Sequence, residues 1–265
     1  MKLVLVSLLY IAVLACKENP KDIKNETEGP GRDTIVFVGV APIINIKKIF
    51  EAHGGLKNWK SKRTLSFTIP KLNTPEIHTV DLYSRNEKIE MPALSMGSSG
   101  NEIWLLDEDE IYKGDPVFYH NLMFYFYAMP FVLADNGIMY STTEPLEFEG
   151  TSYPGVRIGY SEGVGLSSKD EYFIHYNPET FQMEWLGYTV TFRSGEKSEN
   201  IKWIRYNDWM SVDGVKLPKS ITWHEYEGRT IKEARDLVNF ENVTLSETAL
   251  PIDFFSQPEG AKIMQ

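Results

Sequence analysis

The sequence predicts a mainly β (α+β) fold, a strongly curved antiparallel sheet that forms an unclosed barrel with one or two helices covering its concave side. Three observations lead to this prediction. Short segments with a residue period of two follow one another from residue 64 onward. Turn signals separate them with few helical patterns between, which favours a meander of antiparallel strands. One long, almost continuously apolar segment, residues 116–134, interrupts this rhythm and must be buried.

The chain begins with a leader of the secretory type. Lys2 is followed by an apolar run that ends at Leu14, and Ala15 precedes Cys16. The run is shorter than the ~20 residues that a membrane-spanning helix needs. Val13 to Cys16 resembles the lipobox of bacterial lipoproteins, which implies removal of the leader and attachment of a lipid to the Cys16 sulfur. An ordinary signal peptide, or a membrane span that contains a cysteine, is the alternative.

These features predict three regions. Residues 1–15 are a lipoprotein signal peptide, and residues 16–34 are a flexible tether because they are polar, charged and interrupted by Pro and Gly. Residues 35–265 form a single β domain, in which the apolar run 35–40 is a candidate strand. The length is sufficient to bury a sizeable core.

The first regular element of the domain is a short helix, Asn45 to His53. Its apolar residues lie on one face, Asn45 can cap its start, and Gly54-Gly55 can end it in the left-handed conformation. Asn177-Pro178 and Asp213-Gly214 are turn signals between strands. The predicted strands are 64–69, 77–83, 101–106, 155–160, 170–176, 183–193, 200–206, 220–227 and 233–244.

The apolar segment is the best candidate for a functional site. Val117 to Met129 is predicted as a helix, with Pro116 at its first turn and Pro130 ending it. Its aromatic and methionine side chains exceed what one narrow core stripe needs, and methionine adapts to irregular apolar partners. The alternative is that they fill the concave side of the sheet and leave no cavity. The candidate ligand-binding residues are Phe118, Met123, Phe124, Tyr127, Met129 and Phe131, together with Trp185 and Trp223 on strands that are expected at the centre of the sheet.

The composition excludes several classes of function. The chain has 37 Asp+Glu against 27 Lys+Arg, so it lacks the positive charge of a nucleic-acid-binding protein. With Cys16 as the only cysteine, the domain has neither a disulfide nor a thiolate metal site. No protein partner is indicated by any motif.

The sequence patterns that could indicate catalysis do not meet the structural requirements of the corresponding enzymes. Residues 159–163 match the G-x-S-x-G pattern, but the segment after Ser161 is a Gly-rich turn and another strand, whereas a serine hydrolase requires a helix there. The five histidines have no HxH or HExxH spacing. We therefore expect no catalytic residue, no metal and no cofactor, and a hydrolase that uses Ser161 remains a third hypothesis.

Several motifs together resemble a known superfamily. They are a helix ending in Gly54-Gly55 and followed by Trp59, a strand that runs into an Asn-Pro turn (171–186), an Asp-Gly turn that leads to Leu-Pro (206–218), and the close DFFSQP (253–258). They resemble the outer-membrane lipoprotein-sorting and lipoprotein-localisation-factor superfamily. The segments 124–138 and 185–192 are similar to a family of uncharacterised envelope lipoproteins within it.

The resemblance implies a half-barrel whose helices cover the concave side, where characterised members hold acyl chains or another apolar ligand. This chain differs from the soluble carriers because it is predicted to be lipid-anchored. We therefore expect a non-enzymatic envelope lipoprotein, most simply of the outer membrane, that binds a lipid or other apolar small molecule in the concavity. The alternative is a structural or interaction module whose barrel is filled by side chains.

Overall fold

The computed structural model describes residues 41–160 and 169–264 of the chain. The predicted signal peptide, the tether with Cys16, the run 35–40 and Ser161 lie outside the described residues. The predictions that concern them are therefore not tested here by the structure.

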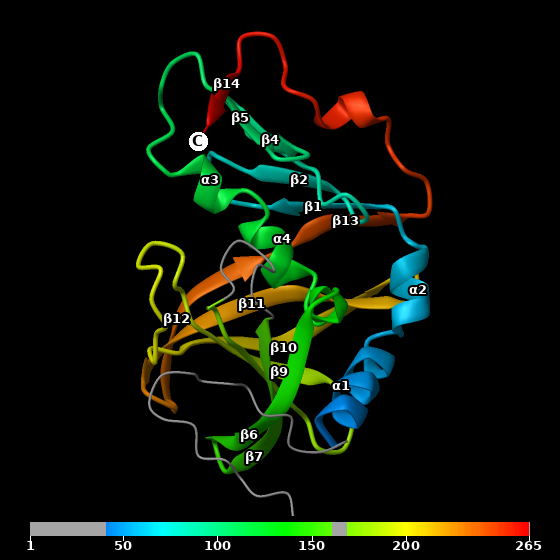
Figure 1. Ribbon diagram of the computed structural model, residues 1–265, viewed down its shortest axis with the longest axis vertical. Coiled ribbons are helices and arrows are strands. Elements are labelled where there is room, and N and C mark those ends of the chain that lie inside the picture. The colour runs from blue at the N-terminus through cyan, green and yellow to red at the C-terminus, as the bar shows by residue number, and fades with distance from the viewer. Residues whose placement is uncertain (1–40, 161–168, 265) are drawn as a thin grey trace, which may run out of the picture. The chain divides into compact units, whose positions relative to one another are not determined.

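The described strands form two antiparallel sheets of seven strands each, within the compact unit Ile35–Gln265 (Figure 1). Sheet A has the order β13-β1-β2-β3-β4-β5-β14. Its strands are β1 (Thr64–Ile69), β2 (Glu76–Asp81), β3 (Glu87–Glu90), β4 (Ser95–Ser99), β5 (Glu102–Leu106), β13 (Glu241–Ser246) and β14 (Lys262–Met264). Sheet B has the order β12-β11-β10-β9-β8-β7-β6. Its strands are β6 (Ile138–Phe148), β7 (Thr151–Tyr160), β8 (Tyr172–Tyr176), β9 (Met183–Tyr188), β10 (Lys202–Val212), β11 (Val215–Glu227) and β12 (Thr230–Asn239).

The predicted class, an antiparallel β structure that does not close and that carries a few helices, is confirmed. Register shifts interrupt several strand pairs, among them β6–β7, β10–β11 and β11–β12. Such bulges bend a strand and increase its twist, which accounts for curvature in a sheet built from long strands. The Asp213-Gly214 turn is also confirmed, since both residues have positive φ and Val212 pairs with Val215 across it.

The structure divides the strands between two sheets where the sequence predicts one. The predicted strand 233–244 is interrupted at Phe240, which separates β12 in sheet B from β13 in sheet A. Phe240 is buried, and its backbone N–H donates to the carbonyl of Lys219, 2.9 Å away. One nearly continuous stretch of chain therefore carries the connection from sheet B to sheet A.

Two helices precede the first strand, α1 (Ala41–Ala52) and α2 (Leu56–Ser61). The glycine pair between them has positive φ at both residues, as the sequence predicts. A Cβ on Gly54 would lie 2.2 Å from the carbonyl oxygen of Gly214, so the helix end packs directly on the β10–β11 turn. The Gly54-Gly55 and Asp213-Gly214 motifs both belong to the family resemblance described above. They are about 160 residues apart in the sequence, and they meet in space.

The apolar segment 116–134, here named the cover segment, is not one helix. It consists of α3 (Pro116–Tyr119), α4 (Leu122–Tyr127) and the 3₁₀ turn η1 (Phe131–Ala134). Asn121 has φ 59°, a left-handed conformation that breaks the predicted helix between α3 and α4. A second 3₁₀ turn, η2 (Ile252–Phe255), precedes β14.

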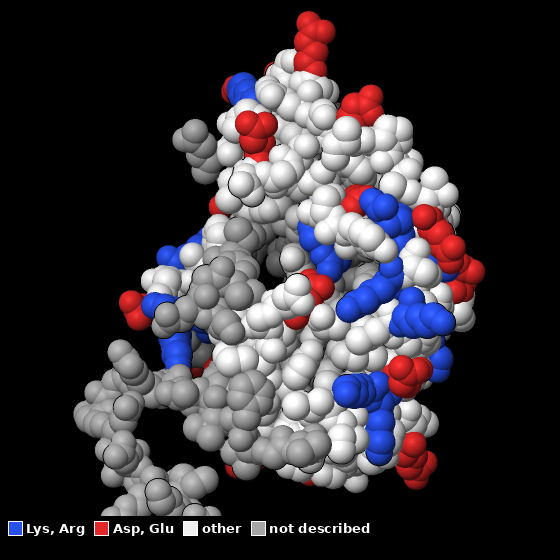
Figure 2. Space-filling view, turned by 45° about the vertical axis from the view of Figure 1, so that its right-hand side comes forward, with Lys and Arg blue, Asp and Glu red and all other residues white. Residues whose placement is uncertain are grey.

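The surface carries charges of both signs. On the face shown in Figure 2, Lys and Arg side chains stand beside Asp and Glu side chains. None of the helices in the described part of the chain is long and apolar enough to span a membrane.

Candidate functional site

The cover segment supplies most of the predicted ligand-binding residues, and the structure places them inside the main hydrophobic core. Phe124 and Tyr127 are fully buried, and Met129 and Phe131 are each 1% exposed. Met123 is buried in the same cluster. In this structure these side chains fill the space beside the sheets.

The cover segment contacts both sheets. The Tyr127 ring lies 4.4 Å from that of Phe67 on β1 and 4.3 Å from that of Phe240. The Phe126 ring lies 5.6 Å from that of Trp223 on β11. The backbone carbonyl of Phe126 also accepts a hydrogen bond from the hydroxyl of Tyr206 on β10 (2.8 Å). The structure thus brings Trp223 together with the cover segment.

Two predicted residues lie apart from this group. Phe118 is half-buried and packs its ring 5.5 Å from that of Phe192. Trp185 is fully buried, but it belongs to a second hydrophobic cluster with Leu146, Tyr153 and Trp203. Its neighbour Leu186 belongs to the main core, and successive residues of a strand face opposite sides, so Trp185 lies on the other face of sheet B.

The second cluster contains polar groups that the sequence analysis does not identify. The guanidinium of Arg205 lies 4.7 Å from the ring centre of Trp185 and pairs with Glu184 at 2.9 Å. Burial lowers the pKa of His175 to about 4, although its hydrogen bond to the Tyr153 carbonyl acts in the opposite direction. His175 is therefore neutral and structural at neutral pH.

An open hollow of about 630 Å³ lies next to this cluster. Its described lining includes Thr143, Arg157, Glu171 and Phe173, and it includes none of the predicted ligand-binding residues. Arg157 and Glu171 form an ion pair across it. The lining is mixed in charge, and nothing in it selects one class of ligand.

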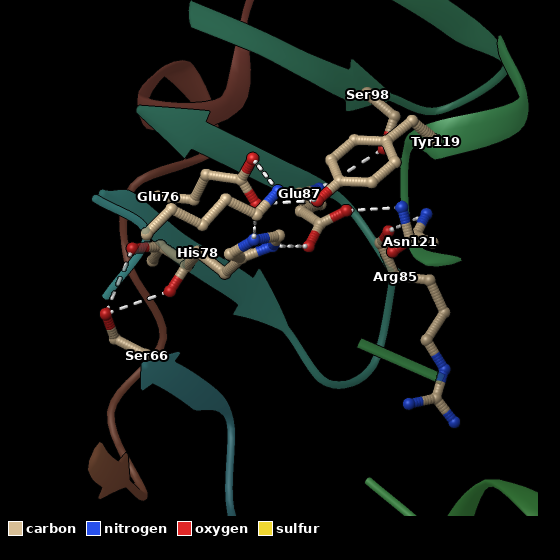
Figure 3. A network of polar contacts seen from close by, with 10 residues as sticks. Ser66, Glu76, His78, Arg85, Glu87, Ser98, Tyr119 and Asn121 are labelled. Carbon is tan, nitrogen blue, oxygen red and sulfur yellow. Dashed lines mark hydrogen bonds and ion pairs between the residues drawn. The ribbon is translucent and has the colours of Figure 1, made fainter. Parts of the chain in front are cut away.

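A buried group of ionisable residues lies where the cover segment meets sheet A (Figure 3). His78 on β2 stands between Glu76, also on β2, and Glu87 on β3, and we call these three residues the carboxylate–histidine cluster. The Nδ1 atom of His78 lies 3.0 Å from Oε1 of Glu87, and its Nε2 atom lies 3.4 Å from Oε2 of Glu76. His78 and Glu87 are fully buried, and Glu76 is 4% exposed.

The electrostatics of the cluster favour its charged form. Burial lowers the pKa of His78, but the hydrogen bonds and negative charges of Glu76 and Glu87 outweigh it and raise that pKa above its usual range. Burial raises the pKa of Glu76, but hydrogen bonds from His78, Lys71 and Tyr119 outweigh it and lower that pKa to about 2. Alternating polar and apolar residues predict the strand but not this cluster, because its members come together only when β2 pairs with β3.

The described residues include no group of three or more His, Cys, Asp or Glu side chains arranged to hold a metal ion. The carboxylate–histidine cluster has little access to solvent, so a substrate could not reach it in this conformation.

Comparison with protein families gives one match. Residues 96–232 match the model of a family of unknown function (DUF6503). No curated protein matches the chain.

Comparison with solved structures gives proteins of very low sequence identity. The chain is similar to a LolA superfamily protein from Nitrosomonas europaea, with 9% identity, 82% of this chain and 97% of that chain covered, and a TM-score of 0.47. It is similar to a DUF1329 family protein from Desulfovibrio piger, with 10% identity, coverages of 81% and 97%, and a TM-score of 0.49. A domain from Vibrio parahaemolyticus, described as outer membrane lipoprotein-sorting, gives 7% identity, coverages of 81% and 96%, and a TM-score of 0.45.

The superfamily that the sequence resembles is thus found among the solved structures to which the chain is similar. All three TM-scores are below 0.5, and the fold described above rests on the strand pairing itself.

Proposed function

The chain belongs to the family of unknown function DUF6503, and from this premise we propose that it is a non-enzymatic binding protein of the cell envelope that holds a lipid or other apolar molecule beneath its cover segment. One observation carries the proposal. The space beside the two sheets is filled by a separate, broken segment, residues 116–134, and an apolar ligand could replace these side chains without dismantling a strand pair.

The energetics allow such a replacement. Fully burying one Phe or Met side chain stabilises the folded protein by about 1.5–3 kcal/mol, so displacing Phe124, Met129 and Phe131 costs about 5–9 kcal/mol. A sixteen-carbon chain buried in the same place would contribute about 12 kcal/mol gross, at about 0.8 kcal/mol per methylene, before the cost of ordering it. The free energy lost by displacing these side chains and the free energy gained by burying the acyl chain are close enough for reversible binding.

The hydroxyl of Tyr127 supports a ligand that has a polar end. It is buried in the core and has no hydrogen-bond partner among the described residues. Burial raises the pKa of Tyr127, so the hydroxyl keeps its proton and can donate. An ester or carboxylate oxygen of a lipid would satisfy this donor, and leaving it unpaired costs about 1–3 kcal/mol.

The proposal includes attachment to a membrane. Cys16 would carry acyl chains after removal of residues 1–15, and residues 16–34 would tether the domain to the outer membrane. The resemblance to lipoproteins supports this location. An anchored protein would act as an acceptor or a holder of its ligand rather than as a diffusing shuttle.

Extraction of the purified protein tests the proposal. The mature chain is exported in a Gram-negative host behind a cleavable leader, with Cys16→Ser to remove the anchor, and is purified without detergent. Mass spectrometry of an organic extract should find a lipid or other apolar molecule in near-stoichiometric amount. A clean, empty and monodisperse protein would instead support the structural or interaction module, which the complete burial of Phe124 and Tyr127 favours.

Substitutions locate the site. Phe124→Asp and Met129→Asp, made separately, should abolish retention of the extracted molecule, because a carboxylate would face the apolar chain. Leu237→Asp is the control, since Leu237 is 61% exposed on β12 and should leave retention unchanged. Tyr127→Phe should weaken retention of a ligand with a polar end while keeping the ring in place. If folded Phe124→Asp and Met129→Asp proteins retain the ligand as the parent does, the site lies elsewhere.

A further inference from the structure

Hydrogen-bond donors surround the two carboxyl groups of the carboxylate–histidine cluster. In Glu76, Oε1 accepts from Nζ of Lys71 (2.5 Å), and Oε2 accepts from the hydroxyl of Tyr119 (2.6 Å) and from His78. In Glu87, Oε1 accepts from His78, and Oε2 accepts from the backbone N–H of Asn121. The hydrogen bonds that Glu76 accepts outweigh the effect of burial and lower its pKa to about 2, so this carboxyl group is ionised.

This geometry favours the protonated form of His78. A neutral imidazole carries one N–H and can donate to one carboxylate only. Both ring nitrogens of His78 face carboxylate oxygens, so a proton on each nitrogen satisfies both contacts, and the two carboxyl groups raise the pKa of His78 despite its burial. When His78 is protonated, its charge and that of Lys71, an exposed side chain that pairs with Glu76, balance the charges of the two carboxylates.

The cover segment depends on this arrangement at two points, visible in Figure 3. Tyr119 at the end of α3 donates to Glu76, and Asn121, which breaks the segment, donates its backbone N–H to Glu87. The side-chain amide of Asn121 also donates to the carbonyl of Arg85 (3.2 Å). The two carboxylates therefore hold the first half of the cover segment through charge-assisted hydrogen bonds.

A stack of rings connects the cluster to the apolar core. The imidazole of His78 is parallel to the ring of Phe67, at 4.7 Å between centres and 7° between planes. Phe67 in turn packs against Tyr127 of the cover segment (4.4 Å) and against Phe240 (5.7 Å). The Phe67 side chain thus connects His78 to the proposed ligand site.

Few other groups near the cluster change charge close to neutral pH. Burial raises the pKa of Tyr112 to about 12, and burial together with the charge of Glu76 raises the pKa of Tyr119. Lys71 adds positive charge beside Glu76, whereas the guanidinium of Arg85 pairs with Asp135. In this set, His78 is the group whose pKa is raised from the usual histidine value of 6.5, because the hydrogen bonds and charges of Glu76 and Glu87 outweigh its burial.

We propose that the carboxylate–histidine cluster is a proton-controlled latch, which keeps the cover segment closed while His78 is protonated and releases it for ligand exchange when His78 loses its proton. The statement about ligand exchange rests on the proposed function, whereas the opening of the segment does not.

The charges of the cluster determine in which direction a change of pH moves the cover segment. A neutral His78 leaves one carboxylate without its hydrogen bond, and Lys71 then balances only one of the two negative charges, which is unfavourable in a buried site. Opening the cover segment admits water to both carboxylates. Because the closed form binds the His78 proton more tightly than an exposed histidine does, closure is fully favoured below about pH 6.5 and is lost as pH rises through the raised pKa of His78.

Hydrogen exchange measured by mass spectrometry tests the latch on the full mature chain carrying Cys16→Ser. Exchange of residues 116–134 is followed from pH 6 to 10 and corrected for the intrinsic rate. The corrected opening constant should be flat at low pH and then rise by up to about tenfold per pH unit, as release of one proton requires. Exchange of β10 (Lys202–Val212) is the internal control and should show no such rise.

Two variants and a control identify the group responsible. Glu87→Gln removes one negative charge and should move the rise to lower pH by about one unit or more. His78→Gln cannot titrate and should abolish the pH dependence. His224→Gln, at a histidine outside the cluster, should behave as the parent. An unchanged pH profile in Glu87→Gln, or a flat profile in the parent, would overturn the latch.

A fluorescent apolar probe, N-phenyl-1-naphthylamine, separates the latch from the proposed function. If exchange rises with pH and probe binding rises with it, both are supported. If exchange rises but the probe binds at no pH, the latch stands and the proposed ligand site fails. If the probe binds equally at every pH and exchange is flat, the ligand site stands and the latch is refuted.

Discussion

At the scale of single residues, burial decides what each histidine does. The sequence places His53 at the end of the first helix, where a cation is favoured. The structure instead buries its ring completely, 4.5 Å from that of Trp209, with Nδ1 donating to the carbonyl of Ile49 (2.8 Å). Burial lowers the pKa of His53 to about 4, although the bond to Ile49 acts in the opposite direction.

This shift predicts a loss of stability in acid. The folded pKa of His53 lies below its unfolded value of 6.5, so the unfolded chain binds the extra proton first and stability falls as pH drops from about 6.5 to 4. The contribution is at most about 3 kcal/mol, from 1.36 kcal/mol per pKa unit. In urea unfolding, His53→Gln should show a smaller loss over this range than the parent. His224→Gln should lose as much as the parent, and equal losses in His53→Gln would contradict the assignment.

At the scale of elements, the cover segment owes its shape to local signals that the apolar pattern hides. The carboxylate of Asp115 caps α3 by accepting from the backbone N–H groups of Val117 (3.0 Å) and Phe118 (3.2 Å). Pro116 follows at the first helical position. Asn121 then interrupts the helix, and its backbone N–H, free of the helical ladder, reaches Glu87.

The Asp115 cap leads to a prediction about the stability of the cover segment. Asp115→Ala should destabilise α3 by about 0.5–2 kcal/mol, which increases hydrogen exchange in residues 116–127 roughly 2- to 30-fold. Asp115→Asn preserves a capping oxygen and should change exchange little. Equal exchange in Asp115→Ala and the parent would show that tertiary contacts, rather than the cap, maintain α3.

At the scale of the domain, residues of both sheets share one hydrophobic core, to which Phe240 belongs. Phe240 lies at the point where the chain leaves sheet B for sheet A, and its ring packs against Phe67 of sheet A and Tyr127 of the cover segment. It is 2% exposed. A residue in this position should determine whether both sheets unfold together.

Phe240→Ala should therefore lower the free energy of unfolding by about 3–5 kcal/mol, because the truncation leaves a cavity between three elements. Leu237→Ala, on exposed β12, should change it by no more than about 0.5 kcal/mol. Calorimetry of Phe240→Ala would then show a lower melting temperature or two separate transitions. A melting curve that matches that of Leu237→Ala would rule out this role.

Local patterns were sufficient to predict much of this architecture. The period of two identifies β1, β2 and β8, the Asp213-Gly214 turn joins β10 to β11, and the glycine pair ends α1. These features depend on residues that are neighbours in the chain, so their physical causes are visible in the sequence. The same holds for the antiparallel class, which follows from consecutive strands joined by short turns.

Contacts between distant residues were decided by the tertiary structure alone. Trp185 lies on the opposite face of sheet B from Leu186 and the cover segment, because strand pairing selects the face that each residue presents. Likewise, His78 and Glu87 resemble ordinary polar strand residues until β2 pairs with β3 and the cover segment seals them from water. The sequence by itself thus determined the antiparallel class and the apolar segment 116–134. Only the fold decided that this segment fills the core and closes over a buried histidine between two carboxyl groups, since desolvation and charge pairing arise only when the strands are assembled.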